Sequence, residues 1–164
     1  MEAQLPVALA ATRKSVVISL DGGVNWYSAR LPSFLTKIHG VALDSNSNLW
    51  LATREGAFRS SDNGDRWRHV LAGLPATNVV SITYDAEGKR LLATAASSHS
   101  LFESTDGGRS WRRAAEVGAA LRAFHTGHGR VFASTSFDGV LAQPVTPTPP
   151  ASLDSSAAGG GSPR

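Results

Sequence analysis

Three stretches of the chain follow one pattern: Ser19-Leu-Asp21-Gly-Gly23-Val-Asn-Trp26, Ser60-Ser-Asp62-Asn-Gly64-Asp-Arg-Trp67 and Ser104-Thr-Asp106-Gly-Gly108-Arg-Ser-Trp111. Each matches S-x-D-x-G-x-x-W, and we name them box 1, box 2 and box 3 in chain order. Their Asp residues lie 41 and 44 residues apart. A pattern that returns at a fixed period of this length indicates a fold built from repeated structural units.

Two further markers return with the same period. The first is a Leu-Ala or Phe-Ala pair, whose second residue is Ala10, Ala52, Ala93 or Ala133. The second is a polar turn that opens eight residues before the last three of those Ala residues, at Asp44, Asp85 and His125. Because three independent markers share one period, the repeat is not a chance match.

Short apolar runs fill the space between the markers. One period holds residues 41–43, 48–52, 57–60 and 67–71, and the next holds residues 79–84, 90–94, 100–104 and 111–115. Gly, Asp, Asn or Ser separates nearly all of these runs, as is typical of strands joined by turns. Four short strands every 40–45 residues is the period of a β-propeller blade. The Ala content of residues 113–122 favours a helix, but Gly118 and the repeat register predict strand, loop and strand there.

The sequence therefore predicts an all-β partial propeller of about three to four blades, each a four-stranded antiparallel sheet. If the strands of a blade are lettered A to D, the chain supplies B-C-D, then A-B-C-D twice, then A-B-C. We expect residues 1–145 to form these repeats and residues 146–164, rich in Pro, Ser and Gly, to form a disordered tail or linker. Because the first unit lacks A and the last lacks D, we expect self-association or a missing partner chain to complete the ring.

Composition excludes several functional classes. The chain has 164 residues and no Cys, so disulfides and thiolate chemistry are excluded. A net charge of +3 is too small a basic excess to indicate nucleic-acid binding. No apolar run approaches the roughly 18 residues that a membrane helix requires. Residues 1–11 resemble a short export signal, but they contain Glu2 and no Lys or Arg, which favours a strand and leaves the compartment open.

No metal or cofactor site is predicted. The five His residues are scattered along the chain. A calcium loop needs more oxygen ligands than the one Asp and one Ser that each box offers. The box residues instead suit a tight turn, because Gly tolerates positive φ and the Ser and Asp side chains hydrogen-bond to turn amides. We expect the Trp of each box to bury its ring against the blade.

The boxes resemble the Asp-box, also called the bacterial neuraminidase repeat, over about residues 5–141. This repeat occurs in sialidases, xyloglucan-degrading glycosidases, sortilin-type receptors and propellers that resemble photosystem II assembly factors. In these families it is a peripheral corner of the blade. The resemblance therefore implies structural roles for Ser19, Asp21, Gly23, Trp26, Ser60, Asp62, Gly64, Trp67, Ser104, Asp106, Gly108 and Trp111.

A ligand site is expected on the face opposite the boxes. Alternating strand direction places the boxes and the A–B turns on one face, and the B–C loops and blade connections on a second face with longer loops. The candidates there are Arg13 and Arg54 for an anionic ligand, Glu55 and Asp138 as a carboxylate pair, and His99. Ordinary solvated turn residues are the alternative interpretation of all five.

Two functional hypotheses follow. The first is a non-catalytic propeller piece that acts as a protein-interaction or assembly scaffold, as resemblance to the assembly-factor propellers implies. The second is a fragment of a glycoside hydrolase or sialidase-like enzyme whose catalytic residues lie partly outside this chain. We therefore expect the ligand to be a protein or a carbohydrate rather than a nucleic acid. We expect no segment of the chain to span a membrane.

Overall fold

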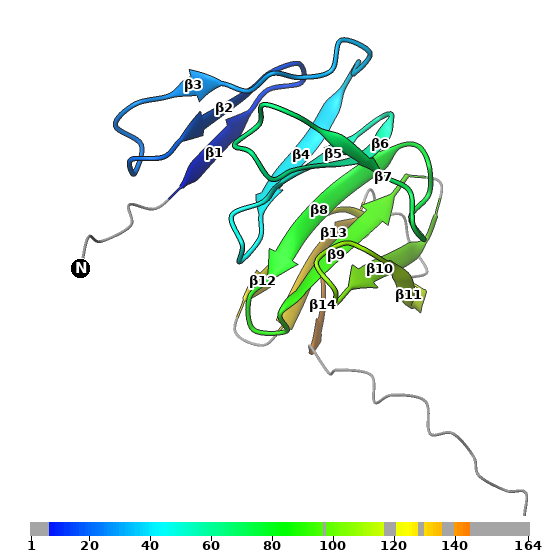
Figure 1. The fold of residues 1–164 in the computed structure, drawn as a ribbon. Coiled ribbons are helices and arrows are strands. Elements are labelled where there is room, and N and C mark those ends of the chain that lie inside the picture. Colours follow the sequence, from blue (N-terminus) through cyan, green and yellow to red (C-terminus); the bar gives the residue numbers. More distant parts are fainter. Residues whose placement is uncertain (1–6, 97, 117–120, 128–129, 136–139, 145–164) are drawn as a thin grey trace, which may run out of the picture.

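The computed structural model describes residues 7–96, 98–116, 121–127, 130–135 and 140–144, and all regular structure in these ranges is β (Figure 1). The first sheet contains β1 (Ala8–Ala11), β2 (Val16–Ser19) and β3 (Tyr27–Ser28). The second contains β4 (Ile38–Leu43), β5 (Leu49–Thr53), β6 (Gly56–Ser60) and β7 (Arg68–Val70). The third contains β8 (Val79–Asp85), β9 (Arg90–Ala95), β10 (Ser100–Ser104) and β11 (Arg112–Glu116). The fourth contains β12 (Leu121–Gly127), β13 (Arg130–Thr135) and β14 (Val140–Pro144).

The strand order confirms the predicted organisation. Each of the four sheets pairs its strands in chain order, with three strands in the first and last sheets and four in the two between. All pairings are antiparallel. Ala10, Ala52, Ala93 and Ala133 occupy equivalent places on β1, β5, β9 and β13. The Ala-rich segment contributes strands β11 and β12 rather than a helix. The expected tail at residues 146–164 lies outside the described residues.

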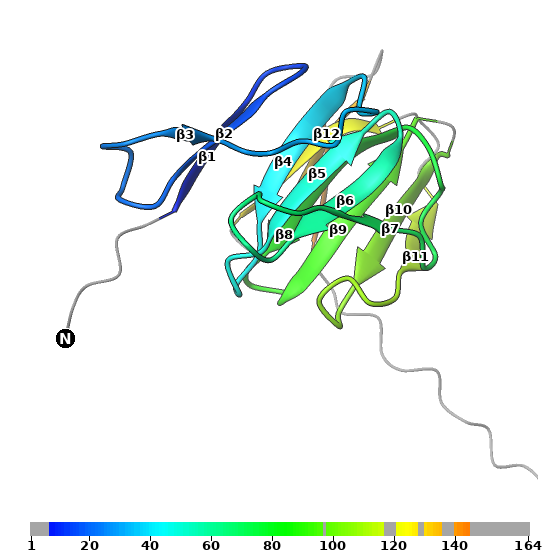
Figure 2. The same ribbon diagram turned by 45° about the horizontal axis from the view of Figure 1, so that its top comes forward.

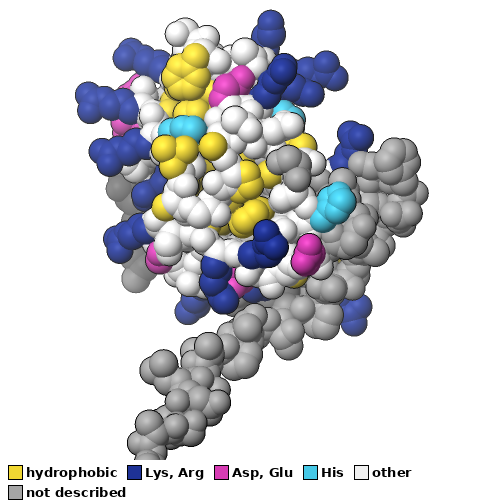
Figure 3. All heavy atoms as spheres, turned by 90° about the vertical axis from the view of Figure 1, so that its right-hand side faces the viewer, with side chains coloured by type: hydrophobic (Ala, Val, Ile, Leu, Met, Phe, Trp, Pro, Cys, Tyr) yellow, Lys and Arg dark blue, Asp and Glu magenta, His cyan; other side chains and the backbone are white. Residues whose placement is uncertain are grey.

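The sheets stack in chain order like blades, as Figures 1 and 2 show from two directions. Their first strands lie close together, with β1 against β4, β4 against β8 and β8 against β12. The described residues include no helix that is long and apolar enough to cross a membrane. On the side of the molecule seen in Figure 3, Lys and Arg side chains gather along one edge and hydrophobic side chains show near the middle.

Strand β5 shows how the sequence fills the space between blades. Alternate side chains of a strand point to opposite faces of its sheet. Leu49 and Leu51 join the core shared with the first sheet, whereas Trp50 and Ala52 join the core shared with the third. Every residue of β5 is buried, so the sheet is covered on both faces at this strand, and residues 49–52 form a continuous apolar run. A smaller core lies between the third and fourth sheets, and its buried residues are Leu92 and Ala133.

Candidate functional site

The boxes fold into corners that are held by their own side chains. In box 1 the hydroxyl of Ser19 donates to Asp21 Oδ1 at 2.7 Å and accepts the Gly23 amide at 2.8 Å. The carboxylate of Asp21 accepts the amides of Val24 and Asn25 at 3.0 and 2.9 Å. Hydrogen bonds to Asn25 and to Ser19 lower the pKa of Asp21 to about 2. The side chain is therefore an anion that organises the turn.

Boxes 2 and 3 repeat this arrangement. The hydroxyls of Ser60 and Ser104 each donate to the box Asp at 2.8 Å. The same hydroxyls accept the amide of the box Gly at 2.9 and 2.8 Å. The backbone amide of Arg66 lowers the pKa of Asp62. In all three boxes, the Ser and Asp side chains are thus committed to the corner itself.

Boxes 2 and 3 also pack against the sheet before them. A Cβ atom at Gly64 would lie 2.8 Å from Ile18 Cδ1 in the first sheet, and one at Gly108 would overlap the ring of Trp50 in the second. The amide of Arg30, after β3, donates to the Gly64 carbonyl at 2.9 Å. Both glycines therefore allow one blade to touch the next, and their positive φ of 85° and 82° suits them to the turn.

The box Trp residues differ in burial, and one expectation needs correction. Trp111 is buried and packs edge-on against Trp50 with ring centroids 6.1 Å apart, and Trp67 is half-buried against the core of the first two sheets. Trp26 is 46% exposed, so its ring is not buried against the blade as expected. Its Nε1 donates to the carbonyl of Gly23 within its own box at 2.9 Å. In the described chain, no sheet packs on box 1 as the first sheet packs on box 2 and the second on box 3, which accounts for the difference.

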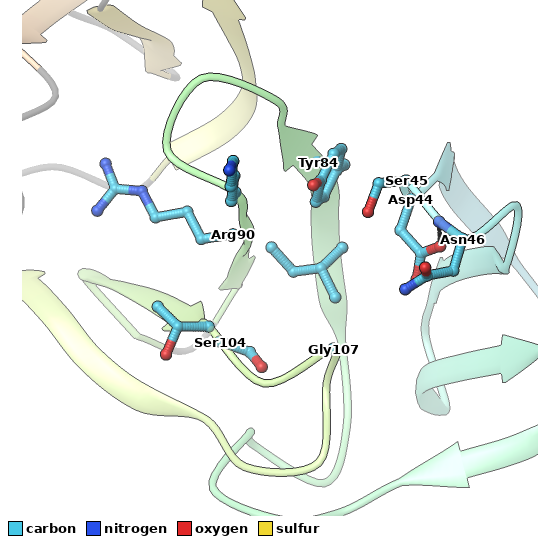
Figure 4. A pocket seen from close by; sticks show the side chains of 10 residues that line it. Asp44, Ser45, Asn46, Tyr84, Arg90, Ser104 and Gly107 are labelled. Atoms are coloured by element: carbon cyan, nitrogen blue, oxygen red, sulfur yellow. Dashed lines mark hydrogen bonds between the residues drawn. The ribbon is translucent and has the colours of Figure 1, made fainter.

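A pocket of about 200 Å³ lies on the box face, between the second and third sheets. It is lined by the turn that follows β4, the turn between β8 and β9, and box 3 (Figure 4). Asp44, on its wall, accepts the indole N–H of buried Trp50 at 3.0 Å and the side-chain amide of Asn48 at 2.9 Å. Burial raises the pKa of Asp44, but these hydrogen bonds outweigh burial and lower it.

Four charged side chains join across the third sheet beside this pocket. Arg90 contacts Asp85 at 3.1 Å through Nε and Glu103 at 2.6 Å through Nη1. Arg112 contacts the other oxygen of Glu103, which is almost fully buried. The two acids and two bases neutralise one another, so Arg90 has no free charge to offer a ligand in the pocket.

A larger groove of about 400 Å³ lies on the second face, between the first and second sheets. Leu31, Pro32, Leu35 and Ile38 supply its apolar lining, and Lys14, Ser33 and Thr36 supply the polar part. This is the face on which the sequence places a ligand site. The groove has room for the side chains of an extended ligand but is too open to exclude water.

Exposed basic residues converge beside this groove. The Arg13 carbonyl accepts the Ile38 amide at 2.8 Å, and the Lys37 carbonyl accepts the Arg54 amide at 2.9 Å, which fixes both loops to the start of β4. Arg13, Lys14, Lys37 and Arg54 are all exposed. Within the described part of the chain, none of these four side chains forms an ion pair.

Glu55 has a structural partner at the same place. Its carboxylate accepts the hydroxyl of Thr36, which belongs to the connection between β3 and β4. Burial raises the pKa of Glu55, but the Thr36 hydroxyl and nearby amides produce a net decrease. A carboxylate with a lowered pKa is ionised at neutral pH, so it is poorly suited to donate a proton as a general acid.

The structure brings some of the sequence candidates together. Arg13, Arg54 and Glu55 lie around the groove, whereas exposed His99 precedes β10 in the third sheet and is not among the groove residues. Asp138 lies outside the described residues. The sequence did not single out Lys14 or Lys37, because single Lys residues in polar loops carry no pattern. Within the ranges described, no cluster of three or more His, Asp or Glu side chains could hold a metal ion.

Comparison with known proteins identifies solved structures of similar architecture. No family model matches the chain, and no curated protein sequence matches it. Among solved structures, the GH74 xyloglucanase from Xanthomonas campestris is 26% identical with a TM-score of 0.60, over 83% of this chain and 22% of the enzyme. YCF48 bound to a D1 peptide is 15% identical with a TM-score of 0.57, over 82% of this chain and 51% of YCF48. Virginiamycin B lyase from Staphylococcus aureus is 17% identical with a TM-score of 0.55, over 82% of this chain and 50% of the lyase.

The chain thus spans about a fifth to a half of the length of these proteins. They differ in function but share one architecture, which is also the one that the repeat period predicts. The chain has the fold of consecutive β-propeller blades.

Proposed function

We propose that the chain is a non-catalytic propeller unit that acts as a protein-interaction or assembly scaffold, akin to the assembly-factor propellers of the Asp-box type. The groove on the second face carries this proposal. Its lining combines apolar and polar side chains, exposed cations lie beside it, and the nearby carboxylate of Glu55 accepts a hydrogen bond from the hydroxyl of Thr36 in its wall. An extended protein segment with apolar and acidic side chains is complementary to such a surface.

The fold supports this role. One protein of like architecture, YCF48, was solved with a D1 peptide bound. The Ser and Asp side chains of the boxes, by contrast, form their hydrogen bonds within the corners. We therefore propose that they are structural and contact no ligand. The Asp-box assignment of the chain rests on the pattern S-x-D-x-G-x-x-W and on these shared hydrogen bonds.

Peptide selection tests the proposal. Peptides selected from a displayed random library on the purified chain are resynthesised and titrated by fluorescence anisotropy. We expect acidic peptides, with affinity that falls as salt increases. The exposed groove variants Lys14→Glu and Ser33→Glu should each weaken binding by about tenfold, which corresponds to about 1.4 kcal/mol. Arg66→Glu, an exposed charge reversal in box 2, should leave it unchanged. If all three variants bound the selected peptides with equal affinity, the groove would not be the peptide-binding site.

A piece of a glycoside hydrolase or sialidase-like enzyme is the second candidate, favoured by the 26% identity to a xyloglucanase. In that case Glu55 would be a catalytic carboxylate with Asp138. Release of reducing ends from xyloglucan, or of sialic acid from sialyllactose, tests this candidate. Turnover that disappears in Glu55→Gln would replace the scaffold proposal, whereas turnover that persists in Glu55→Gln would exclude Glu55 as the catalytic carboxylate.

A further inference from the structure

The pocket on the box face has walls that are fixed by their own hydrogen bonds. Asp44 holds the turn after β4 by accepting the backbone amide of Asn46 at 2.9 Å. In the turn between β8 and β9, Asp85 accepts the amide of Gly88 at 3.1 Å. Box 3 is held by its own Ser and Asp side chains. The hollow between these three loops is therefore formed without a ligand, which lowers the entropy cost of binding one.

Part of the pocket lining is apolar and aromatic. Leu91 is buried, and half-buried Tyr84 packs against the core between the second and third sheets. Both residues also line the pocket. An aromatic ring at such a place can pack against the C–H face of a ligand, and a Tyr ring adds a hydroxyl for hydrogen bonding.

Polar side chains without protein partners surround this apolar part. Ser45 and Asn46 come from the turn after β4, Lys89 from the turn between β8 and β9, and Thr105 from box 3. All four residues are exposed, and within the described ranges none of their side chains forms a hydrogen bond or an ion pair. Their hydroxyl, amide and ammonium groups allow the pocket both to donate and to accept hydrogen bonds.

The charge and the size of the pocket favour a small neutral occupant. The carboxylate of Asp44, which its hydrogen bonds keep ionised, offsets the ammonium of Lys89. The guanidinium of Arg90 is neutralised by two acids and points away from Tyr84 in Figure 4. Pockets for drug-sized molecules have roughly 300–1,000 Å³, whereas this one has about 200 Å³. The volume therefore suits a ligand of about the size of one sugar ring.

We propose that this pocket binds a single neutral pyranose ring. The hydroxyl groups of a pyranose donate and accept hydrogen bonds, as the side chains of Ser45, Asn46 and Thr105 do, and its C–H face is complementary to Tyr84 and Leu91. An apolar ligand would leave the polar groups of the pocket unpaired, and an inorganic anion would leave the aromatic and apolar lining uncovered. The pocket lies on the face opposite the groove, so this proposal is independent of the proposed function.

Titration of the full chain with neutral methyl pyranosides tests the proposal. The panel contains the glucoside, galactoside, mannoside, xyloside and N-acetylglucosaminide, and the backbone amide signals are followed by NMR. At least one sugar should bind saturably, with a dissociation constant on the order of 1 mM because the ligand is small. It should shift the signals of residues 45–46 and 105–107. Binding of none of these sugars, shifts confined to residues 31–36 of the groove, or binding of inorganic phosphate alone would overturn the proposal.

Exposed variants of the pocket test its place on the molecule. Asn46→Ala and Thr105→Ala each remove one hydrogen-bonding group and should each weaken sugar binding by about fivefold. Both should unfold at the wild-type temperature, because neither side chain has a partner in the described chain. Ser61→Ala is the matched control, since Ser61 holds the place of Thr105 in box 2 and does not line the pocket. Unchanged affinity in both pocket variants, or an equal loss in Ser61→Ala, would show that the sugar does not bind here.

Discussion

Replacing Asp44 with Ala should remove a large part of the stability of the two central sheets. The carboxylate accepts five hydrogen bonds of 2.9–3.0 Å, from the backbone amides of Asn46 and Asn48, the side-chain amide of Asn48 and the indole of Trp50. Trp50 and Asn48 are buried, so water cannot freely replace the lost acceptor. A buried donor left without a partner costs about 1–3 kcal/mol, and two such donors give about 2–6 kcal/mol. The free energy of unfolding of a whole domain is only about 5–15 kcal/mol, so this loss would be a large part of it.

Urea unfolding followed by Trp fluorescence measures this loss, with Asp65→Ala as the control. Asp65 is an exposed acid whose ion pair with Arg30 spans 3.6 Å, and such surface pairs contribute about 0–1 kcal/mol. Asp44→Asn should fall between the two, because it keeps one acceptor oxygen and loses the other. A loss below about 1 kcal/mol for Asp44→Ala would refute the view that this side chain satisfies buried donors.

Three further predictions concern the boxes. Gly108→Ala should destabilise the protein in urea more than Gly107→Ala, because both have positive φ but only a Cβ at 108 meets the preceding sheet; equal losses would contradict the contact. Ser104→Ala should raise the free energy of the folded state by about 1–3 kcal/mol, measured by thermal melting, since its buried hydroxyl both donates and accepts within box 3. Asp21 has a pKa of about 2, below its ordinary 3.8, so its contribution to stability is complete above pH 3.8 and lost as pH falls toward 2. Carboxyl NMR titration checks this value, and a midpoint near 3.8 would contradict it.

The blade organisation was predictable because it depends on local chemistry. A tight turn requires Gly, Ser and Asp at fixed places within eight residues, so the box is visible in the sequence wherever it occurs. The strand runs between boxes then follow from the period. The three strands described in the first and the last sheet also follow from the period, because each falls at the position that the repeat assigns to it.

Features that depend on contacts between residues far apart in the sequence were not predictable. Glu103 looks like an ordinary polar strand residue, yet it is buried and joined to Arg90 and Arg112, which lie 13 residues before it and nine after it. The exposure of Trp26 likewise depends on which sheets pack on box 1 in the described chain, which the box sequence does not encode. On the second face, the approach of Lys14 and Lys37 to one groove required the packing of two sheets.

The missing side chains at Gly64 and Gly108 have a consequence for the curvature of the whole stack. These positions lie where one sheet meets the next, so the size of the residue there helps to set the distance and tilt between neighbours. In a repeat protein a small rotation per unit adds up along the chain and determines its overall curvature. A bulkier residue in every box would open each junction slightly and change the radius of the arc. A single atom position, repeated from blade to blade, thus influences how many blades fit into a closed circle.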